Sequence, residues 1–190
     1  MKNEQGKGRN KISLRDLSRL LSEDIRVYSG SGKIHLRLLA RHMCFNASLQ
    51  LIVMYRWSHF IYTRGRVGAV ISWALEWLEM VLFGCLIACE AEIGRRFRIA
   101  HPTGIVIGLA KIGDNVTIWQ NVTIGASGIV GENKEWPTIE NNVKIFANAV
   151  IVGGITVGEG STIGALTFIN RDVPQDSVAL TEKTLSKPTE

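Results

Sequence analysis

The chain has 190 residues, of which 46% are hydrophobic and 21% are charged, and its net charge is +5. A chain of this length and composition buries a sizeable core, which excludes intrinsic disorder and collagen-like repeats. Residues 1–66 hold 13 Lys and Arg against 4 Asp and Glu, whereas the remaining residues hold 9 against 13. Glycine is also unevenly distributed, since 12 of the 19 lie between Gly94 and Gly164. The sequence therefore predicts two regions of different architecture.

The first region, residues 1–92, is predicted to be helical after a short tail. Residues 1–12 are polar and predict a flexible tail. No signal peptide is expected, because the first 33 residues are charged and contain no apolar run of the required length. From Ser13, a candidate N-cap, apolar residues recur every three or four positions as far as Tyr28, which indicates an amphipathic helix. A second helix is expected over about residues 33–63. Three cysteines without paired spacing indicate neither a disulfide framework nor a cysteine zinc site, so we expect a cytoplasmic protein.

A third apolar segment, Val67–Cys89, raises the question of a membrane. Its only charges, Glu76 and Glu79, each cost about 2.5–3.5 kcal/mol at the centre of a bilayer. They lie on one side of a helix, and Trp73 and Trp77 form another pair on its surface. Three placements remain open, namely spanning, peripheral contact with the anionic inner membrane, and packing against protein. Nucleic acid is not expected as a partner, because the basic residues are dispersed and no binding motif accompanies them.

Residues 93–173 contain an internal repeat with a period of six residues. Aliphatic residues hold every sixth position in three blocks, with a one-residue slip after the first block and a longer insertion after the second. The twelve are Ile93, Ile99, Ile105, Ile112, Ile118, Ile124, Ile139, Ile145, Ile151, Val157, Ile163 and Ile169. This period predicts a parallel β-solenoid of about four coils, with three short strands and about 18 residues in each coil.

The predicted organisation is α+β. It comprises a tail (1–12), a helical domain (13–92), a β-helix domain (93–173) and a C-terminal tail (174–190). The longer insertion contains Gly, Asn and Pro, so residues 126–137 are predicted to form a loop extruded from a corner of the solenoid. Such a loop either carries function or is a neutral surface loop, and both interpretations remain open.

Among the four histidines, only His101 lies in the repeat. One histidine in each chain does not build a three-histidine site, so no metal is expected. A histidine at a corner suits the role of general base in acyl transfer from a thioester to a hydroxyl, which needs a group with a pKa near 7. His59 is interpreted as a packing residue of its apolar helix, and His35 and His42 as solvent-facing.

Several segments of the repeat resemble a known family. They are HPTGIVIG from His101, IGDNVTIWQNVTIG from Ile112, the run from Trp136 to Ala165, and DVP from Asp172. With the preceding helical segment YRWSHFIYTRG, they resemble the serine acetyltransferase branch of the left-handed β-helix acyltransferases, over about residues 14–180. The resemblance implies a left-handed β-helix, an acetyl-CoA-dependent O-acetyltransferase, and His101 as the base that deprotonates the acceptor hydroxyl.

The acceptor site departs from the family pattern. Ala100 stands where the family has Asp, and Glu135 and Trp136 stand where it has the Arg-His pair for an amino acid's carboxylate. Glu135 repels a carboxylate, whereas Trp136 offers a flat apolar surface for a sugar. We therefore expect a saccharide acceptor, a capsular or exopolysaccharide unit or its precursor, as in the similar colanic-acid and capsular polysaccharide O-acetyltransferases. The alternatives are a serine acetyltransferase with an altered acceptor site and a non-catalytic solenoid scaffold.

A further departure concerns the carboxylate that orients the family's histidine, whose position here is Leu86. Its loss is expected to lower the basicity of His101 without abolishing its role. Substitution by Glu90, by Glu92 or by a backbone carbonyl remains open.

The resemblance also implies where acetyl-CoA binds. Small residues line the pantetheine groove between two subunits, and their counterparts here are Ala126, Ala147 and Ala165. Lys183 is a candidate phosphate contact. Such a groove requires at least a homotrimer, and pairing of trimers into a hexamer remains open.

Overall fold

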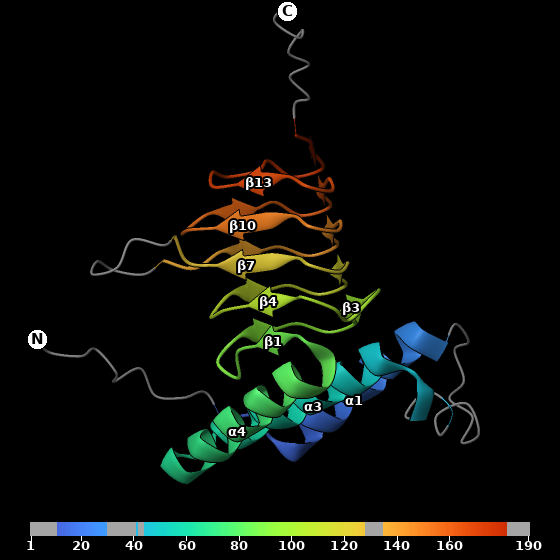
Figure 1. Cartoon of the computed structure of the whole chain (residues 1–190), viewed down its shortest axis with the longest axis vertical. Coiled ribbons are helices and arrows are strands. Elements are labelled where there is room, and N and C mark those ends of the chain that lie inside the picture. Colours follow the sequence, from blue (N-terminus) through green and yellow to red (C-terminus); the bar gives the residue numbers. More distant parts are fainter. Residues whose placement is uncertain (1–10, 30–40, 42–43, 128–134, 182–190) are drawn as a thin grey trace, which may run out of the picture.

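The structure is a computed structural model that describes residues 11–29, 41, 44–127 and 135–181. Helices α1 (Leu14–Ser29), α3 (Ala47–Tyr62) and α4 (Arg66–Phe83) lie together at one end of the molecule. Short strands follow them in sequence and stack into a column above the helices (Figure 1). The fold is therefore α+β, with helices first and a parallel β-solenoid after them, as the sequence predicts.

Fourteen strands within the described ranges form three parallel sheets, one on each side of the solenoid. Sheet A contains β1 (Leu86–Ile87), β4 (Val106–Ile107), β7 (Thr123–Gly125), β10 (Val150–Val152) and β13 (Phe168–Ile169). Sheet B contains β2 (Glu92–Ile93), β5 (Lys111–Ile112), β8 (Thr138–Ile139) and β11 (Thr156–Val157). Sheet C contains β3 (Arg98–Ile99), β6 (Thr117–Ile118), β9 (Lys144–Ile145), β12 (Thr162–Ile163) and β14 (Val178–Ala179). Successive strands visit the three sheets in turn, which gives four full coils and part of a fifth.

The hexad residues fill the solenoid core, but the register differs from the predicted one at one place. Ile107, and not Ile105, is aligned with Ile87 below it and Ile124 above it. Ile105 is also buried, two positions earlier, so both residues fit an apolar periodicity. The step from Ile99 to Ile107 is therefore two residues longer than a hexad, and the next step, to Ile112, is one residue shorter. The two extra residues widen the corner that carries His101.

The solenoid begins earlier than the sequence analysis places it. Helix α4 ends at Phe83, and Gly84 takes a left-handed conformation with φ of 61° that stops the helix. Residues 84–92, expected in the helical region, instead start the first coil. Ile87 lies six positions before Ile93 and belongs to the repeat, but the surrounding apolar run concealed it. At the other end, β14 continues the solenoid beyond residue 173.

The first helix forms as predicted, and the second is interrupted within its predicted range. Ser13 caps α1, since its Oγ accepts a hydrogen bond from the Asp16 backbone N–H at 3.1 Å. The helix expected over residues 33–63 is interrupted at Asn46, which is extended and whose side chain accepts the Leu49 N–H at 3.1 Å, so α3 begins at Ala47. Arg41, Cys44 and Phe45, before this break, are also helical. The earlier part of that segment, residues 33–40 and 42–43, lies outside the described residues.

Each helix supplies side chains that satisfy the open lower edge of one sheet. At sheet C, α1 acts through Asp24, which accepts the Phe97 N–H at 3.0 Å, and through Tyr28, which accepts the Ile99 N–H at 2.7 Å. At sheet B, α3 acts through Arg56, which donates to the Ile93 carbonyl at 2.6 Å. These contacts replace the bonds that a further coil would make.

At sheet A, α4 plays the same part through its two glutamates. Glu79 accepts the Ile87 N–H at 3.3 Å, and Glu76 accepts the Cys89 N–H. The polar stripe of this helix therefore faces the solenoid. Burial raises the pKa of Glu79 to about 8.

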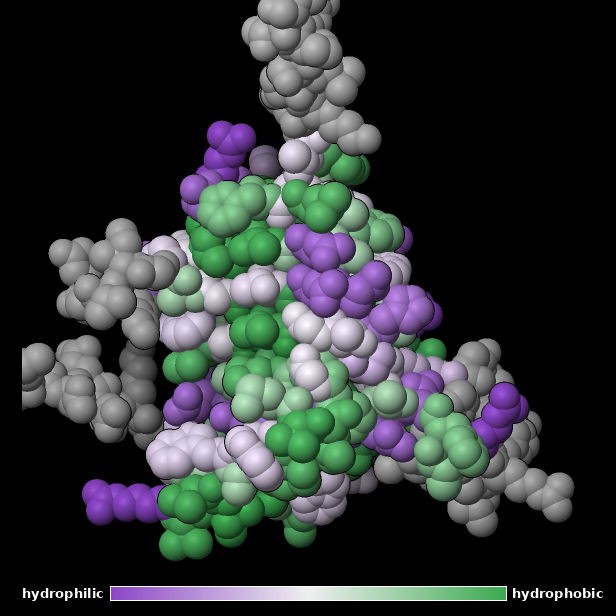
Figure 2. Space-filling view, viewed as in Figure 1, coloured by the Kyte–Doolittle hydropathy of each residue, from purple (hydrophilic) through white to green (hydrophobic). Residues whose placement is uncertain are grey.

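The opposite face of α4 is apolar and exposed. It includes Val67, Val70, Ile71, Trp73, Trp77, Met80, Val81 and Leu82. Among the described helices, none is long and apolar enough to cross a membrane. The outer surface of sheet A is apolar as well, with Val106 and Phe168 exposed, and Figure 2 shows this hydrophobic surface running up the solenoid above the helices.

Candidate active site

The corner between β3 and β4 carries His101 on a backbone that is pinned from three directions. The Ala100 N–H donates to the Ile118 carbonyl above at 2.9 Å, and the Thr103 N–H donates to the His101 carbonyl at 3.0 Å. The Gly104 N–H donates at 3.0 Å to the carbonyl of Gly84 below. The His101 side chain is exposed. A solvent-accessible imidazole on a fixed backbone is the arrangement that a general base needs.

Gly104 is required at this corner for two reasons. Its φ is +64°, a conformation that L side chains rarely adopt, and a Cβ would lie 2.1 Å from Asn121 Oδ1. Asn121 is itself tied to the corner, because its N–H donates to the Thr103 carbonyl at 2.8 Å. The coil above therefore hydrogen-bonds to the turn on both sides of His101, at Ala100 and at Thr103.

The stacked corners above His101 carry two of the three alanines expected to bind acetyl-CoA. Ala147 follows β9 and Ala165 follows β12, and the Leu166 N–H donates to the Ala147 carbonyl at 3.1 Å. Ala126 follows β7, so it lies at the other edge of sheet A. Lys183 lies outside the described residues. Within one chain, the structure therefore brings His101, Ala147 and Ala165 onto one edge and separates Ala126 from them.

Glu135 and Trp136 lie at the same edge as Ala126, where the loop 126–137 leaves and rejoins the solenoid. A Cβ on Gly108 would meet the Trp136 ring at 2.0 Å, so the ring packs directly on the Gly108 backbone. The Glu135 side chain likewise packs on the Gly154 backbone, where an added Cβ would lie 2.5 Å from Glu135 Cβ. His101 lies between sheets C and A, whereas Ala126 and Trp136 lie between sheets A and B, and Figure 1 shows β3 of sheet C on the right of sheet A. A single chain does not place these two residues beside His101.

The position expected to hold an orienting carboxylate is apolar, and the two proposed replacements lie elsewhere. Leu86 lies in β1 directly below Val106. Glu90 lies at the corner between sheets A and B and accepts a hydrogen bond from the Tyr62 hydroxyl at 2.6 Å. Glu92 lies on sheet B. Neither glutamate lies at the corner of His101. The expectation that Glu90 or Glu92 of the same chain replaces the orienting carboxylate is therefore wrong.

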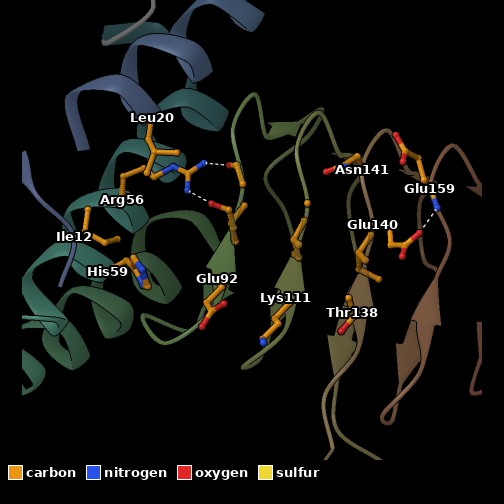
Figure 3. Close-up of a pocket in the computed structure, with 15 residues that line it drawn as sticks. Ile12, Leu20, Arg56, His59, Glu92, Lys111, Thr138, Glu140, Asn141 and Glu159 are labelled. Carbon is orange, nitrogen blue, oxygen red and sulfur yellow. Dashed lines mark hydrogen bonds between the residues drawn. The ribbon is translucent and has the colours of Figure 1, made fainter. Parts of the chain in front are cut away.

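A separate groove of about 520 Å³ lies between the helices and sheet B (Figure 3). Its lining includes His59, Glu92, Lys111 and Glu140, and Figure 3 shows Arg56 at its helical end, bound to main-chain carbonyls. The Nδ1 of His59 lies 2.6 Å from the Cys89 carbonyl, and burial lowers the pKa of the ring. His59 therefore donates from Nδ1 as a neutral packing residue, as predicted.

Two features near His101 were missed by the sequence analysis. Trp119 and Phe146 stack one coil apart, with ring centroids 4.4 Å apart and planes at 17°. Gln120 follows Trp119 and has a buried Oε1 without a hydrogen-bond partner in the described part of the chain. The aromatic pair had a signal, since both residues follow an inward isoleucine of the repeat. The burial of Gln120 Oε1 without a hydrogen-bond donor depends on packing that the sequence does not reveal.

His35 and His42 lie outside the described residues. Over the described ranges, no group of three His, Cys, Asp or Glu side chains is placed to hold a metal ion.

The chain is similar to proteins of known family. The sequence model described as "Bacterial transferase hexapeptide (six repeats)" matches residues 137–171. The serine acetyltransferase of Bacillus licheniformis is 39% identical over 135 residues, which cover 70% of this chain and 61% of that protein. The serine acetyltransferase of Helicobacter pylori is 36% identical over 136 residues, covering 71% of this chain and 78% of that protein.

A solved structure shows the same similarity in three dimensions. The Neisseria gonorrhoeae serine acetyltransferase in complex with serine superposes with a TM-score of 0.76 at 27% identity, covering 92% of this chain and 69% of that chain. The present chain thus spans about three-fifths of the Bacillus relative and more than three-quarters of the Helicobacter one.

Proposed function

Because the chain belongs to the serine acetyltransferase family of left-handed β-helix proteins, we propose that it transfers an acetyl group from acetyl-CoA to a hydroxyl. The observation that carries this proposal is His101, exposed on a corner whose backbone is fixed by hydrogen bonds to the coils above and below. An imidazole in this setting accepts the proton of the acceptor hydroxyl as its oxygen attacks the thioester carbonyl. The tetrahedral intermediate then collapses with cleavage of the C–S bond, and the CoA thiolate takes the proton from the imidazolium and leaves as a thiol, which returns His101 to its neutral form.

The relatives favour L-serine as the acceptor, over the saccharide that the sequence analysis expects. All of the similar proteins described above are serine acetyltransferases, and one was solved with serine bound. Serine is therefore the first acceptor to test.

A saccharide hydroxyl remains the second candidate, on specific residues. Glu135 is exposed beside Trp136 where the resemblance to serine acetyltransferases implies an Arg-His pair, and an anion there opposes binding of a carboxylate. The Trp136 ring is held against Gly108, so it is a rigid, half-buried surface. Rigid aromatic surfaces bind the apolar faces of sugars at a low entropic cost. A capsular or exopolysaccharide unit would fit this surface.

The two edges of sheet A come together when copies of the chain associate. In a ring with cyclic symmetry and sheet A turned inward, the His101 edge of one copy adjoins the loop edge of the next. The apolar outer surface of sheet A supports this arrangement, which we propose as a homotrimer. The groove between copies would then hold acetyl-CoA along Ala147 and Ala165 of one subunit and Ala126 of the other.

The proposed location of the protein is the cytoplasm, with peripheral contact to the inner membrane as a further possibility to test. A cytoplasmic location follows from the use of acetyl-CoA. Peripheral contact of the α4 face with the inner membrane rests only on its exposed tryptophans and the basic residues before it, and the similar proteins lend it no support.

The test is the release of CoA thiol from acetyl-CoA, measured with L-serine and with a panel of oligosaccharides. Release that depends on serine, with O-acetylserine as the product, establishes the first candidate. Release that depends only on a saccharide, with an acetylated sugar in the mass spectrum, establishes the second. No acceptor-dependent release from the folded protein, together with no binding of acetyl-CoA by calorimetry, would leave the scaffold alternative.

A further inference from the structure

The corner directly above His101 contains a buried side-chain amide oxygen, that of Gln120, which lacks a hydrogen bond within the described ranges. Gln120 Oε1 is buried, and the described part of the chain offers it no hydrogen-bond donor. A buried acceptor without a donor costs about 1–3 kcal/mol, and such groups are few in native proteins. The other one among the described residues is Glu79 Oε1. The cost is easily avoided in evolution, because an apolar side chain of similar size removes it.

Two backbone hydrogen bonds fix Gln120 opposite His101. On one side, the Ala100 N–H donates to the Ile118 carbonyl at 2.9 Å. On the other side, the Asn121 N–H donates to the Thr103 carbonyl at 2.8 Å. The segment between Ala100 and Thr103 therefore lies against the segment between Ile118 and Asn121. His101 belongs to the first segment and Gln120 to the second.

The surroundings hold the Gln120 backbone in place. The preceding residue, Trp119, is stacked on Phe146 of the coil above. The Gln120 carbonyl accepts the Asn148 N–H at 3.0 Å, and the Asn121 side chain donates to Asn148 Oδ1 at 3.1 Å. Since Ile99 pairs with Ile118 in the parallel register, Gln120, two positions after Ile118, is stacked on His101, two positions after Ile99.

We infer that Gln120 is a positioning residue, whose Oε1 accepts a hydrogen bond from one ring N–H of His101 and so holds the other ring nitrogen toward the acceptor. This inference rests on the proposed function. It supplies what Leu86 cannot, since that position carries no carboxylate in this chain. A neutral carbonyl fixes the tautomer and the ring orientation, and it stabilises the imidazolium less than a carboxylate does. Gln120 thus differs from a catalytic residue, because it acts only through His101.

The test compares the pH dependence of kcat/KM for the full chain and for three variants. Gln120→Leu should lose about 10-fold to 100-fold in kcat, the usual cost of losing the group that orients a functional imidazole. The acid limb of its profile should move to lower pH, because the imidazolium loses a favourable dipole. Gln120→Glu should restore activity and move the acid limb to higher pH. The control is Gln175→Leu, the same change at an exposed corner, which should alter neither.

Two outcomes overturn the inference. In the first, Gln120→Leu keeps the wild-type rate and pH profile and melts at a higher temperature, which would mean that the oxygen is only a structural defect. In the second, Gln120→Leu lowers the rate equally in the wild-type and His101→Ala backgrounds, which would mean that it does not act through His101. Failure of the proposed function is distinct, because His101→Ala would then have no effect on acetyl transfer.

Discussion

At the scale of single residues, the role of a titratable side chain depends on where the stacked coils and the helices place it. His101 is exposed, whereas Glu79 is buried at the base of sheet A beneath the same coil. Both are recognisable in the sequence as unusual residues, but only the structure shows their different roles. Glu79 interrupts an apolar run because it accepts the Ile87 N–H, and not because the helix meets a membrane.

Glu79 should make the stability of the protein depend on pH. Burial raises its pKa from the ordinary 4.5 to about 8, so the folded state keeps a proton that the unfolded state loses above pH 4.5. The free energy of unfolding should therefore fall as pH rises from about 5 to 8, with a slope of up to about 1.4 kcal/mol per pH unit. Glu79→Gln should flatten this dependence, measured by urea denaturation across that range. A variant with an unchanged slope would contradict the role assigned to this carboxyl, and Glu92→Gln, on an exposed strand position, is the control.

At the scale of elements, the helices act as a cap for the solenoid, with one helix for each sheet. Asp24 and Arg56 join α1 to α3 through a buried ion pair of 2.9 Å, and each also binds the backbone of the first coil. Such a pair adds little over an apolar pair, but removal of one partner leaves a buried charge.

Asp24→Ala should therefore lower the free energy of unfolding by about 3–5 kcal/mol, because the buried Arg56 loses its counter-ion and the Phe97 N–H loses its acceptor. Thermal and urea unfolding followed by circular dichroism measure this loss. The matched control is Arg19→Ala, which removes a surface ion pair from the same helix and should change little. An Asp24→Ala variant as stable as the control would show that the cap is not held by this pair.

Element by element, the sequence predicts the solenoid better than its ends. The hexad period predicts strands and the buried face directly, because each inward position of the repeat is aliphatic. The start of the first coil was hidden, since Ile87 lies within an apolar run that also fits a helix. The register at Ile105 and Ile107 was ambiguous, because both side chains are buried. The capping role of Asp24 and Arg56 was missed, because it joins residues distant in sequence.

At the scale of the whole molecule, the proposed site requires more than one chain. His101 lies at one edge of sheet A and Trp136 at the other, and the apolar surface between them is exposed (Figure 2). The sequence predicted both residues as parts of a single site, but it could not show that one chain separates them.

Phe168→Glu should dissociate the proposed trimer, because it places a charge on an exposed apolar position of β13, the last strand of sheet A. Val178→Glu is the matched control, since Val178 is about as exposed, at 66% against 61%, but lies on sheet C. Analytical ultracentrifugation should show a monomer that has lost activity for the first variant and an active trimer for the second. A trimeric Phe168→Glu protein would place the interface on another face.

The central claim is that His101 acts as the base in acetyl transfer from acetyl-CoA. The most direct measurement is the rate of acceptor-dependent CoA release by wild type and by His101→Ala, at saturating acetyl-CoA and with the acceptor that supports turnover. The account predicts a loss of about 10²-fold to 10⁴-fold in kcat, the usual contribution of a positioned base, with an unchanged sedimentation coefficient and unchanged acetyl-CoA binding. A correctly assembled His101→Ala protein that turns over at the wild-type rate would contradict it.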